Sequence, residues 1–483
     1  MANGNTSLAK NSIFNVAYQV LNIAFPLITS AYTARILMPS GIGLVAYAQN
    51  IAQYFVIIAA LGIPNYGIRE VARVKSSTKD LNLLFSELFS LNFFSTALSA
   101  LVYYSAIFLL PAFEAERPLF CATGIIIILN ICNVDWFYQG EEEYQYITTR
   151  SFVVKLVSLV LMFVLVRTSS DYVAYALITC AATAGNYLLN MLNLRRFSIR
   201  PAFKRHNLKK HLKPIGLLFA TTVAIEIYTL MDTTMIGVLC ANENVAFYTY
   251  ASRIAKMAIT VICAFGAVLL PRLSLYRSQG DLEGCSQTVN QVLGILLMLL
   301  IPCGIGMYMA SDCLVLTLFG EDYLAASLTL KILSFLFYTL GLSNLFGTQI
   351  LVTFEGEKQL LAATCAGAIF NLIANAFLIP AWQENGAAVA SVISELIVTA
   401  MTYTWAKKKL AFGIGRRELF KLLIAACGMG IVLYALNYLQ APAHIMLILN
   451  IAIGGLVYAV LCRLMKADSL TTITNSIKAL LGK

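Results

Sequence analysis

Long apolar runs without a single charged residue constrain this chain more than any other feature of its sequence. Eight runs lack Asp, Glu, Lys and Arg altogether, at residues 12–34, 41–63, 88–110, 172–194, 284–311, 359–383, 422–442 and 444–462. A helix that crosses a bilayer needs about 20 predominantly apolar residues, so each run is long enough to span. The pattern predicts an integral membrane protein and excludes a water-soluble one.

Six further runs carry one or two charges each, at residues 118–139, 151–167, 214–240, 247–270, 329–352 and 387–406. Charged residues make up 12% of the chain, against about 25% in a typical soluble domain. Fourteen spans would occupy about 280 of the 483 residues, which leaves short loops and no folded soluble domain. We therefore expect an all-α integral membrane protein with fourteen transmembrane helices.

The distribution of Lys and Arg predicts the orientation of these helices. If the N-terminus is cytoplasmic, twenty-six of the 34 basic residues fall in internal loops and five within helices. External loops then hold three basic residues, Arg35, Arg117 and Arg167. Because cytoplasmic loops of membrane proteins are enriched in Lys and Arg, we expect both termini to face the cytoplasm.

The longest basic loop, Arg195–Lys213, divides the chain after the sixth predicted helix. Its charges suit the anionic surface of a cytoplasmic leaflet, so we interpret it as a topology anchor and linker. The sequence thus predicts four parts: an N-terminal lobe of six helices, a basic cytoplasmic linker, a second six-helix lobe, and two more helices with the C-terminus, at residues 1–200, 201–213, 214–406 and 407–483.

A weak internal repeat supports two lobes. Residues Gly43–Ile51 align with Ala246–Ile254 at a shift of 203 positions, and both stretches open an even-numbered predicted helix. A proline follows each of these helices, Pro64 in the first copy and Pro271 in the second. Six crossings return the chain to its starting side, so the two lobes would form a parallel pseudo-repeat about an axis along the membrane normal.

Three sequence motifs lie in order at the ends of predicted helices. They are Leu-Gly-Ile-Pro-Asn-Tyr-Gly-Ile-Arg-Glu-Val-Ala-Arg at 61–73, Asp-Trp-Phe-Tyr-Gln-Gly-Glu at 135–141 with Tyr-Ile-Thr-Thr-Arg-Ser at 146–151, and Ile-Pro at 379–380 with Asn-Gly-Ala-Ala-Val-Ala-Ser-Val-Ile-Ser-Glu at 385–395. Together they resemble segments of the Wzx-type lipid-linked oligosaccharide flippases. This polysaccharide transporter branch belongs to the MOP superfamily, which also holds multidrug exporters and lipid II flippases.

The resemblance implies a function. Such a protein would move an undecaprenyl-diphosphate-linked repeat unit of O-antigen, capsule or exopolysaccharide across the bacterial plasma membrane by alternating access. Its partners would be the lipid-linked oligosaccharide, membrane lipids and other polysaccharide assembly proteins, with no nucleic acid. No cofactor is expected beyond coupling to H⁺ or Na⁺.

Two cations within a predicted helix are candidates for holding the diphosphate. Arg253 and Lys256 lie at i and i+3 on the eighth predicted helix, where they share one face. Charges inside a membrane helix usually face a cavity or a partner. The structural alternative is that they neutralise Asp232 and Glu226 of the preceding helix.

Carboxylates and amides supply further candidates. Glu226, Asp232 and Glu395 can bind H⁺ or Na⁺, or can simply hold helices together by hydrogen bonds. Amides at helical spacing suit sugar hydroxyls because they donate and accept at once, although they also join membrane helices. On the first two helices we favour cavity lining, for Asn15, Gln19, Asn22, Gln49, Asn50 and Gln53, and on the sixth helix contacts between helices, for Asn186, Asn190 and Asn193.

Other charges are expected at the membrane interface. Asp135 and Lys155 would lie near cytoplasmic helix ends, as an interfacial pair or as snorkelling groups. Snorkelling is also the default for Lys331 and Lys421. The eleven cysteines form no CxxC pair, so neither a disulfide framework nor a zinc site is expected. We interpret Glu141–Glu143 as a solvated loop.

Two other functions fit parts of the sequence. A multidrug/ion antiporter of the same superfamily would want an acidic or aromatic cavity, and the first two predicted helices carry no charge. A membrane glycosyltransferase or polymerase usually needs a sizeable external domain, whereas the longest external loop, 310–327, has about 18 residues. Since HExxH, GxSxG, P-loop and dinucleotide motifs are absent, we do not expect an enzyme.

Overall fold

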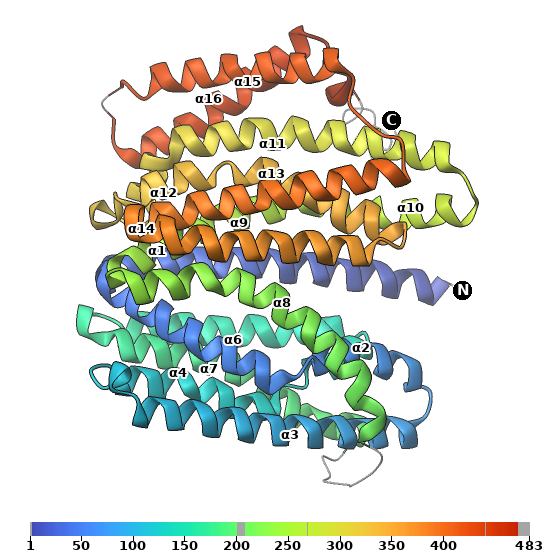
Figure 1. Ribbon diagram of the computed structural model, residues 1–483, viewed down its shortest axis with the longest axis vertical. Helices are drawn as coiled ribbons and strands as arrows, with labels where there is room; N and C mark the ends of the chain where they lie inside the picture. The colour runs from blue at the N-terminus through green and yellow to red at the C-terminus, as the bar shows by residue number, and fades with distance from the viewer. Residues whose placement is uncertain (1, 200–207, 268, 440, 472–483) are drawn as a thin grey trace. The chain divides into compact units, whose positions relative to one another are not determined.

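The computed structural model describes residues 2–199, 208–267, 269–439 and 441–471, with side chains placed except at 2–24, 217, 221, 224, 225, 227, 265–267 and 269–271. Across these ranges the regular elements are helices and no strand occurs (Figure 1). By their internal contacts the described residues form two compact units. The first comprises residues up to Gly237 together with Ala241–Ala246, and the second comprises Val238–Cys240 and the chain from Phe247 onward.

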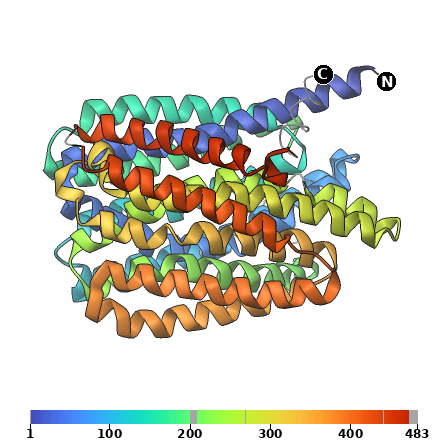
Figure 2. The ribbon, with the colours of Figure 1, turned by 90° about the horizontal axis from the view of Figure 1, so that it is seen from above.

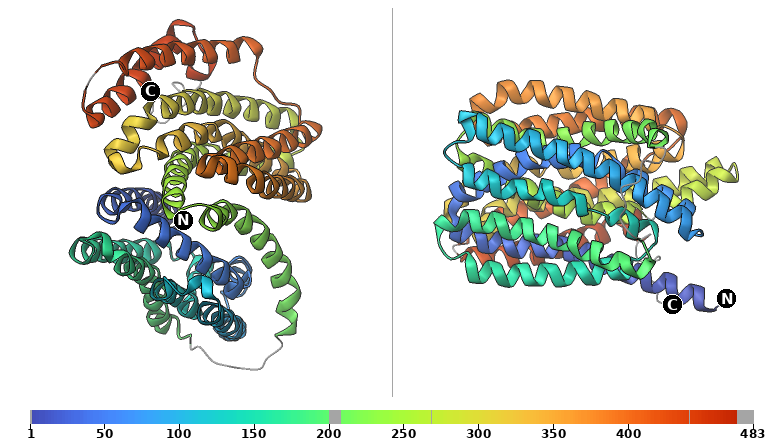
Figure 3. Two further views of the ribbon diagram at one scale, coloured as in Figure 1. Left: turned by 60° about the vertical axis from the view of Figure 1, so that its left-hand side comes forward. Right: turned by 90° about the horizontal axis from the view of Figure 1, so that it is seen from below.

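The first unit contains eight α-helices, which Figure 3 shows from two further directions. In chain order they are α1 (Ala2–Ala60), α2 (Ile63–Val74), α3 (Thr78–Leu109), α4 (Arg117–Leu129), α5 (Asp135–Gly140), α6 (Tyr144–Leu165), α7 (Tyr172–Asn193) and α8 (Lys209–Leu239). Short 3₁₀ turns join several of them, at Pro111–Phe113, Asn130–Cys132, Ser169–Asp171 and Leu194–Phe197. The contacts of α1 with α3, α4 and α6 build the centre of this unit.

The second unit contains the remaining helices. They are α9 (Asn242–Ala267), whose first residues belong to the first unit, α10 (Leu269–Ser278), α11 (Leu282–Leu318), α12 (Ala326–Leu333), α13 (Leu336–Ser343), the π-helix η6 (Asn344–Leu351), α14 (Glu357–Lys409), α15 (Arg416–Leu436) and α16 (Ala443–Leu464). A 3₁₀ turn at Glu321–Tyr323 precedes α12. The pair α15 and α16 packs against α11, and Figure 2 shows these helices from above.

Two long helical segments, α1 and α14, turn back on themselves. The helical dihedral angles break at Met38 in α1 (φ 59°, ψ 168°) and at Gln383 in α14 (φ 51°, ψ −131°). Residues eight apart in a straight helix are separated by about 12 Å. A Cβ on Gly386 would nevertheless lie 2.1 Å from the carbonyl oxygen of Leu378, so the chain reverses there and leaves room only for glycine.

Most helices lie over the predicted apolar runs, but several boundaries were wrong. Six helices begin five or more residues before the predicted start: α1 at Ala2, α3 at Thr78, α6 at Tyr144, α8 at Lys209, α9 at Asn242 and α15 at Arg416. In each case charged or polar residues extend the helix beyond its apolar part. The predicted helix at 329–352 is broken into α12, α13 and the π-helix, with a 41° bend between α12 and the segment Leu336–Leu351.

Eight helical segments of the described chain are long and apolar enough to cross a membrane, or nine if the bent pair formed by α12 and the segment after it is one span. Large apolar side chains are exposed along them. On α3, for example, Phe94, Leu98 and Leu101 are each more than 60% exposed. A surface of this kind is stable against lipid tails and not against water. The structure therefore agrees with the predicted all-α membrane fold.

The two units of internal contacts divide at the end of α8, whereas the two predicted lobes divide at the linker, 201–213, and that prediction stays a prediction. The helix α8 begins at Lys209, inside that linker, and its contacts place it in the first unit. The sequence had assigned its range, 214–240, to the second lobe. Residues 201–207 of the linker lie outside the described residues.

Two of the sequence motifs pack directly against each other. The motif at 61–73 forms α2, and the motif that starts at Asp135 forms α5. A Cβ on Gly67 would lie 2.5 Å from the ring of Trp136, and a Cβ on Gly140 would lie 2.6 Å from Val71. The glycines of both motifs thus allow two short helices to approach closely, which gives these residues a structural role.

A buried carboxylate ties the start of α8 to this part of the first unit. The side chain of Glu87 on α3 is 1% exposed and accepts contacts from Lys210 Nζ at 2.8 Å and His211 Nε2 at 2.9 Å. The other ring nitrogen of His211 lies 2.8 Å from the hydroxyl of Tyr66 on α2. The contacts of this one side chain therefore join α2, α3 and α8. They also keep the carboxylate stable, because a buried charge needs a partner.

Removing this carboxylate should destabilise the fold. We expect Glu87→Ala to lower the free energy of unfolding by about 3 kcal/mol, because buried His211 then loses its partner. The matched control is Glu142→Ala, whose exposed pair with Lys75 should contribute less than about 1 kcal/mol. Unfolding of the purified protein by SDS titration in detergent micelles measures both. Equal losses in the two variants would contradict the assignment.

Candidate functional site

A lysine lies at the midpoint of a helix that is long enough to cross the membrane. Lys155 follows the first residue of α6, Tyr144, by eleven positions, and Leu165 ends the helix ten positions later. At 1.5 Å per residue the lysine is about 16 Å from either end. The expectation that Lys155 lies near a cytoplasmic helix end was therefore wrong.

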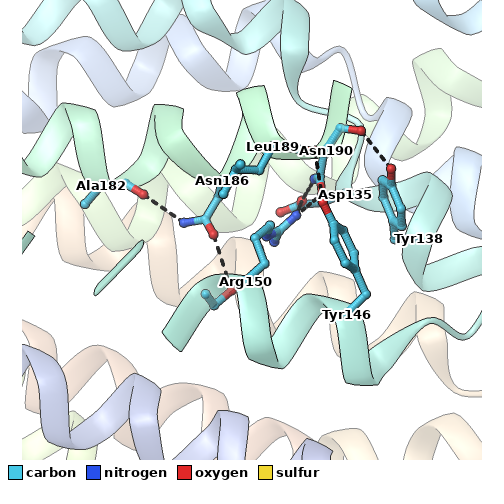
Figure 4. Close-up of polar contacts among 9 residues, drawn as sticks. Asp135, Tyr138, Tyr146, Arg150, Ala182, Asn186, Leu189 and Asn190 are labelled. Atoms are coloured by element: carbon cyan, nitrogen blue, oxygen red, sulfur yellow. Dashed lines mark hydrogen bonds and ion pairs between the residues drawn. The ribbon is translucent and has the colours of Figure 1, made fainter. Parts of the chain in front are cut away.

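One ion pair, between buried Arg150 and half-buried Asp135, lies more than one turn before this lysine. Arg150 is also inside α6, and its side chain is 3% exposed, whereas the sequence had placed it in a loop. Its Nη1 donates to Asp135 Oδ1 at 3.1 Å and to Asn190 Oδ1 (Figure 4). Asn190 in turn donates through Nδ2 to Asp135 Oδ1. The three side chains join α5, α6 and α7 in a closed triangle.

Hydrogen bonds to the backbone of α7 hold this triangle in place. The hydroxyl of Tyr138 donates to the carbonyl of Asn190 at 2.7 Å, and that of Tyr146 donates to Leu189 at 2.9 Å (Figure 4). Asn186, one turn before Asn190, donates to the carbonyl of Ala182 at 2.8 Å. The interpretation of Asn190 as a contact between helices is thus confirmed. The amide of Asn190 also orients the guanidinium of Arg150, which donates to it.

A pocket of about 310 Å³ opens beside the triangle, entirely within the first unit. Its wall combines charges, an amide, hydroxyls and aromatic rings, from Phe25, Asp135, Arg150, Ser151, Lys155, Thr179, Ala182, Thr183, Asn186 and Tyr187. The ammonium of Lys155 lies 5.6 Å from the centre of the Phe25 ring. Two cations and one carboxylate thus lie in the wall of one small pocket whose surface is otherwise mostly apolar.

The amides predicted to line a cavity have different environments. Gln49 donates to the hydroxyl of Thr179, a pocket residue, at 2.7 Å. Asn50 is buried and donates to the carbonyl of Leu230 at 3.0 Å and to the hydroxyl of Thr234 at 2.6 Å, both on α8. Gln53 is exposed. The side chains of the first helix, Asn15, Gln19 and Asn22, lie outside the described residues.

The predicted diphosphate cations lie on α9 in the second unit. The guanidinium of Arg253 lies 5.6 Å from the ring centre of Tyr250, and that ring stacks on Phe319 with centroids 4.5 Å apart. Arg253 is half-buried, whereas Lys256 is exposed. The aromatic stack fixes the direction of Arg253, because a cation is attracted to the face of an aromatic ring.

The candidate ion-coupling carboxylates are buried to different degrees. Asp232 on α8 is 6% exposed, and Glu395 on α14 is 8% exposed. Glu395 lies one turn beyond Ser391, whose hydroxyl is 3.0 Å from that of Tyr248 on α9. Glu226 is half-buried on α8, and its carboxylate lies 3.4 Å from the hydroxyl of Thr229.

The two lysines that were expected to snorkel form ion pairs. Lys331 pairs with Asp312 at 2.8 Å, and Lys421 pairs with Glu418 at 3.5 Å. In the loop before α6, burial raises the pKa of Glu141. The described residues contain no group of three His, Cys, Asp or Glu side chains that could hold a metal ion.

Sequence reasoning missed the pocket because it began the fifth predicted helix at residue 151, just after Arg150. A signal was available. Asp135, Arg150 and Asn190 are polar residues flanking apolar runs, and an acid, a base and an amide can neutralise one another across three helices. With Arg150 allowed inside the helix, its start moves toward Tyr144 and Lys155 moves to the centre.

One family model and several known proteins match the chain. The family described as polysaccharide biosynthesis protein matches residues 8–277. The chain is 22% identical over 402 residues to an Escherichia coli (strain K12) protein named "Putative O-antigen transporter", covering 82% of this chain and 95% of that one. It is 23% identical over 259 residues to the lipid II flippase MurJ of Bacillus subtilis (strain 168), covering 49% of this chain and 48% of MurJ.

Solved structures show the same fold. An inward closed structure of the lipid II flippase MurJ superimposes with a TM-score of 0.78 at 15% identity, covering 96% of this chain and all of that one. An inward-facing multidrug resistance transporter of the MATE family, in the MOP superfamily, gives a TM-score of 0.57 at 16% identity, covering 82% and 97%. At these identities the likeness establishes the fold alone.

A double-mutant cycle tests the buried triangle. We expect Arg150→Met to lower the free energy of unfolding by about 3 kcal/mol, because Asp135 and Asn190 lose their donor. Arg150→Met with Asp135→Asn should recover about 1–3 kcal/mol of this loss, since no uncompensated charge remains. SDS titration of the three variants gives the coupling energy. Simple additivity of the single losses would show that the pair is not coupled.

Proposed function

Because this chain belongs to the polysaccharide biosynthesis protein family, we propose that it is a flippase for lipid-linked oligosaccharides. Its substrate would be an undecaprenyl-diphosphate-linked repeat unit of O-antigen, capsule or exopolysaccharide, moved across a bacterial plasma membrane. The relatives it matches are transporters and flippases, and the protein is accordingly a transporter and not an enzyme.

One observation carries this proposal beyond the family. A membrane-length helix keeps Lys155 at its midpoint, near the ion pair of buried Arg150 with half-buried Asp135, and these three charged groups line one pocket. Ionised side chains at membrane depth are costly and are retained for substrate or ion pathways. A large polar head group attached to a lipid is the cargo that needs such a pathway.

We further propose that the chain crosses the membrane fourteen times with both termini in the cytoplasm. The reversals at Met38 and Gln383 support this count, because each divides one long helical segment into two limbs of membrane length. The bent segment from α12 to η6 supplies one further crossing. Six crossings in each lobe and two in α15 and α16 then account for the whole chain.

The positions of polar residues in the proposed parallel pseudo-repeat support the assignment of a glycan and a diphosphate as the cargo. At the shift of 203 residues, Asn50 on α1 corresponds to Arg253 on α9, and Gln53 corresponds to Lys256. Two positions that hold amides in the first copy of the proposed repeat therefore hold cations in the second copy. Such a division suits a cargo with sugar hydroxyls and a diphosphate.

In the proposed cycle, Arg253 and Lys256 hold the diphosphate while the amides contact the glycan and the lipid tail stays in the bilayer. Arginine offers a bidentate fork to a phosphate, and lysine offers a point charge. Glu226, Asp232 and Glu395 are the proposed sites for a coupling H⁺ or Na⁺. Membrane lipids and other polysaccharide assembly proteins are the proposed partners. Alternating access would move the head group between leaflets.

Reconstitution tests the function directly. Proteoliposomes that contain the purified protein should transfer a fluorescent undecaprenyl-diphosphate-linked oligosaccharide between leaflets, measured by its loss of accessibility to an added glycosidase. Efflux of cationic dyes without such transfer would instead indicate a multidrug/ion antiporter. Growth of the glycan chain without transfer would indicate a polymerase.

The diphosphate assignment makes a separate prediction in the same assay. We expect Arg253→Gln with Lys256→Gln to slow transfer at least about tenfold, because two charge-assisted contacts to the diphosphate are lost. The matched control is Lys358→Gln with Lys408→Gln, which removes two exposed charges at helix ends. Wild-type transfer by the first double variant would remove these residues from the site.

The orientation makes a prediction that needs no substrate. Alkaline phosphatase fused after Glu114, in the loop between α3 and α4, should be active, because that loop is predicted to be external. The same enzyme fused after Ser77, between α2 and α3, should be inactive, whereas green fluorescent protein fused there should fluoresce. The reverse pattern would invert the proposed topology.

A further inference from the structure

We propose that the contacts of α1 with the end of α8 and the start of α9 form the gate that opens this protein to the outside. This inference rests on the proposed flippase function and deepens it, since it names the contacts that separate when the head group leaves. The residues concerned, 43–54, 230–237 and 242–246, all belong to the first unit. The proposed topology places the reversal of α1, the end of α8 and the start of α9 outside.

Two glycines bring the helices of this gate into direct contact. A Cβ on Gly43 of α1 would overlap the backbone carbonyl of Asn242, at the start of α9. One turn further along α1, the ring of Tyr47 covers Gly237 of α8, where a Cβ would overlap that ring. Neither position leaves space for a larger side chain. The contact is therefore closed to water and to a sugar ring.

Neutral hydrogen bonds continue the contact toward the middle of the helices. Asn50 donates to the carbonyl of Leu230 at 3.0 Å and to the hydroxyl of Thr234 at 2.6 Å, and the hydroxyl of Tyr54 lies 2.8 Å from that of Thr234. From Gly43 to Tyr54 the closed contact extends over about 16 Å of α1. Neutral hydrogen bonds between membrane helices are individually weak, so these can break and re-form in a transport cycle.

The internal repeat favours a gate over ordinary helix packing. At the shift of 203 residues, Gly43 corresponds to Ala246 of α9. A Cβ on Gly43 would lie 3.2 Å from the backbone nitrogen of Ala246. Two equivalent positions of a repeat can meet only close to the axis that relates the two copies. In transporters built from such repeats, one copy moves against the other about this region during alternating access.

The same limb of α1 also contacts the pocket beside Arg150. Gln49, next to Asn50, donates to the hydroxyl of Thr179 in the pocket wall at 2.7 Å. Adjacent residues of α1 are thus bonded to α7 on one side and to α8 on the other. When the gate opens, Asn50 loses its acceptors on α8 while Gln49 keeps its own. The amide of Asn50 then becomes available to the glycan.

A disulfide across the gate tests this inference. A Cβ on Gly237 would lie 2.9 Å from Cγ of Tyr47, so Tyr47→Cys with Gly237→Cys places two thiols close to disulfide geometry. In proteoliposomes we expect oxidation of this variant to slow transfer of the fluorescent lipid-linked oligosaccharide at least about tenfold, and reduction to restore it. Each single variant, oxidised in the same way, controls for the native cysteines.

The matched control is an equally close pair away from the gate. A Cβ on Gly341 would lie 3.1 Å from Cγ of Leu300, and both residues belong to the second unit. Oxidation of Gly341→Cys with Leu300→Cys should leave transfer unchanged. Peptide mass spectrometry verifies both disulfides.

A second variant tests the gate without a cargo. Because a Cβ at position 43 would meet the carbonyl of Asn242, Gly43→Ala should hold the gate partly open. In whole cells, we expect a Thr234→Cys side chain to react at least about fivefold faster with a membrane-impermeant maleimide when Gly43→Ala is also present. Gly306→Ala is the matched control, since a Cβ there has nothing within 4 Å, and it should leave the rate unchanged.

Unchanged transfer with the Tyr47–Gly237 disulfide formed, or unchanged labelling in Gly43→Ala, would overturn the gate. If the disulfide does not form, the labelling decides the point. Labelling needs no cargo and so separates the two proposals. Faster labelling in a protein that transfers no oligosaccharide would retain the gate and reject the flippase function, whereas transfer with unchanged labelling would retain the function and reject the gate.

Discussion

The ion pair between Arg150 and Asp135 is the interaction on which the first unit depends. Two charges in an apolar helical bundle are tolerated because the geometry is closed: Asn190 contacts both partners, and tyrosine hydroxyls fix the backbone of α7 around them. With the pair satisfied, α6 extends to Tyr144 and carries Lys155 at its centre. The polar pocket is thus a consequence of how one arginine is neutralised.

Close approaches organise the surroundings of that pair. Asp135 begins α5, which Gly67 and Gly140 allow to pack tightly against α2. On the neighbouring α3, buried Glu87 holds Lys210 and His211 and so attaches the first turn of α8. The motifs that suggested the family therefore lie in the framework that positions Asp135. Their glycines act on packing, and the chemistry of the pocket lies in the charged residues behind them.

The sequence predicted the fold well where apolar runs were free of charge, as for α7, α11 and α16. It failed where a charge extends a helix: Arg150 was assigned to a loop, and the start of α8 was assigned to a linker. Residue patterns cannot reveal that a distant Asp or Glu neutralises such a charge, because that depends on contacts between helices. Of the candidate site residues, Gln49 donates to Thr179 of the pocket wall but does not itself line the pocket, while Lys155 was assigned to the interface.

The charged midpoint of α6 also has a consequence for how the protein is made. A lysine at the centre of a membrane helix adds about 2.5–3.5 kcal/mol to the free energy of insertion, so α6 is a poor substrate for the translocon when it arrives alone. Asp135 leaves the ribosome before Arg150, and Asn190 follows on α7. The groups that neutralise Arg150 of α6 thus lie on the helices directly before and after it in the chain, so they are close at hand when α6 is synthesised.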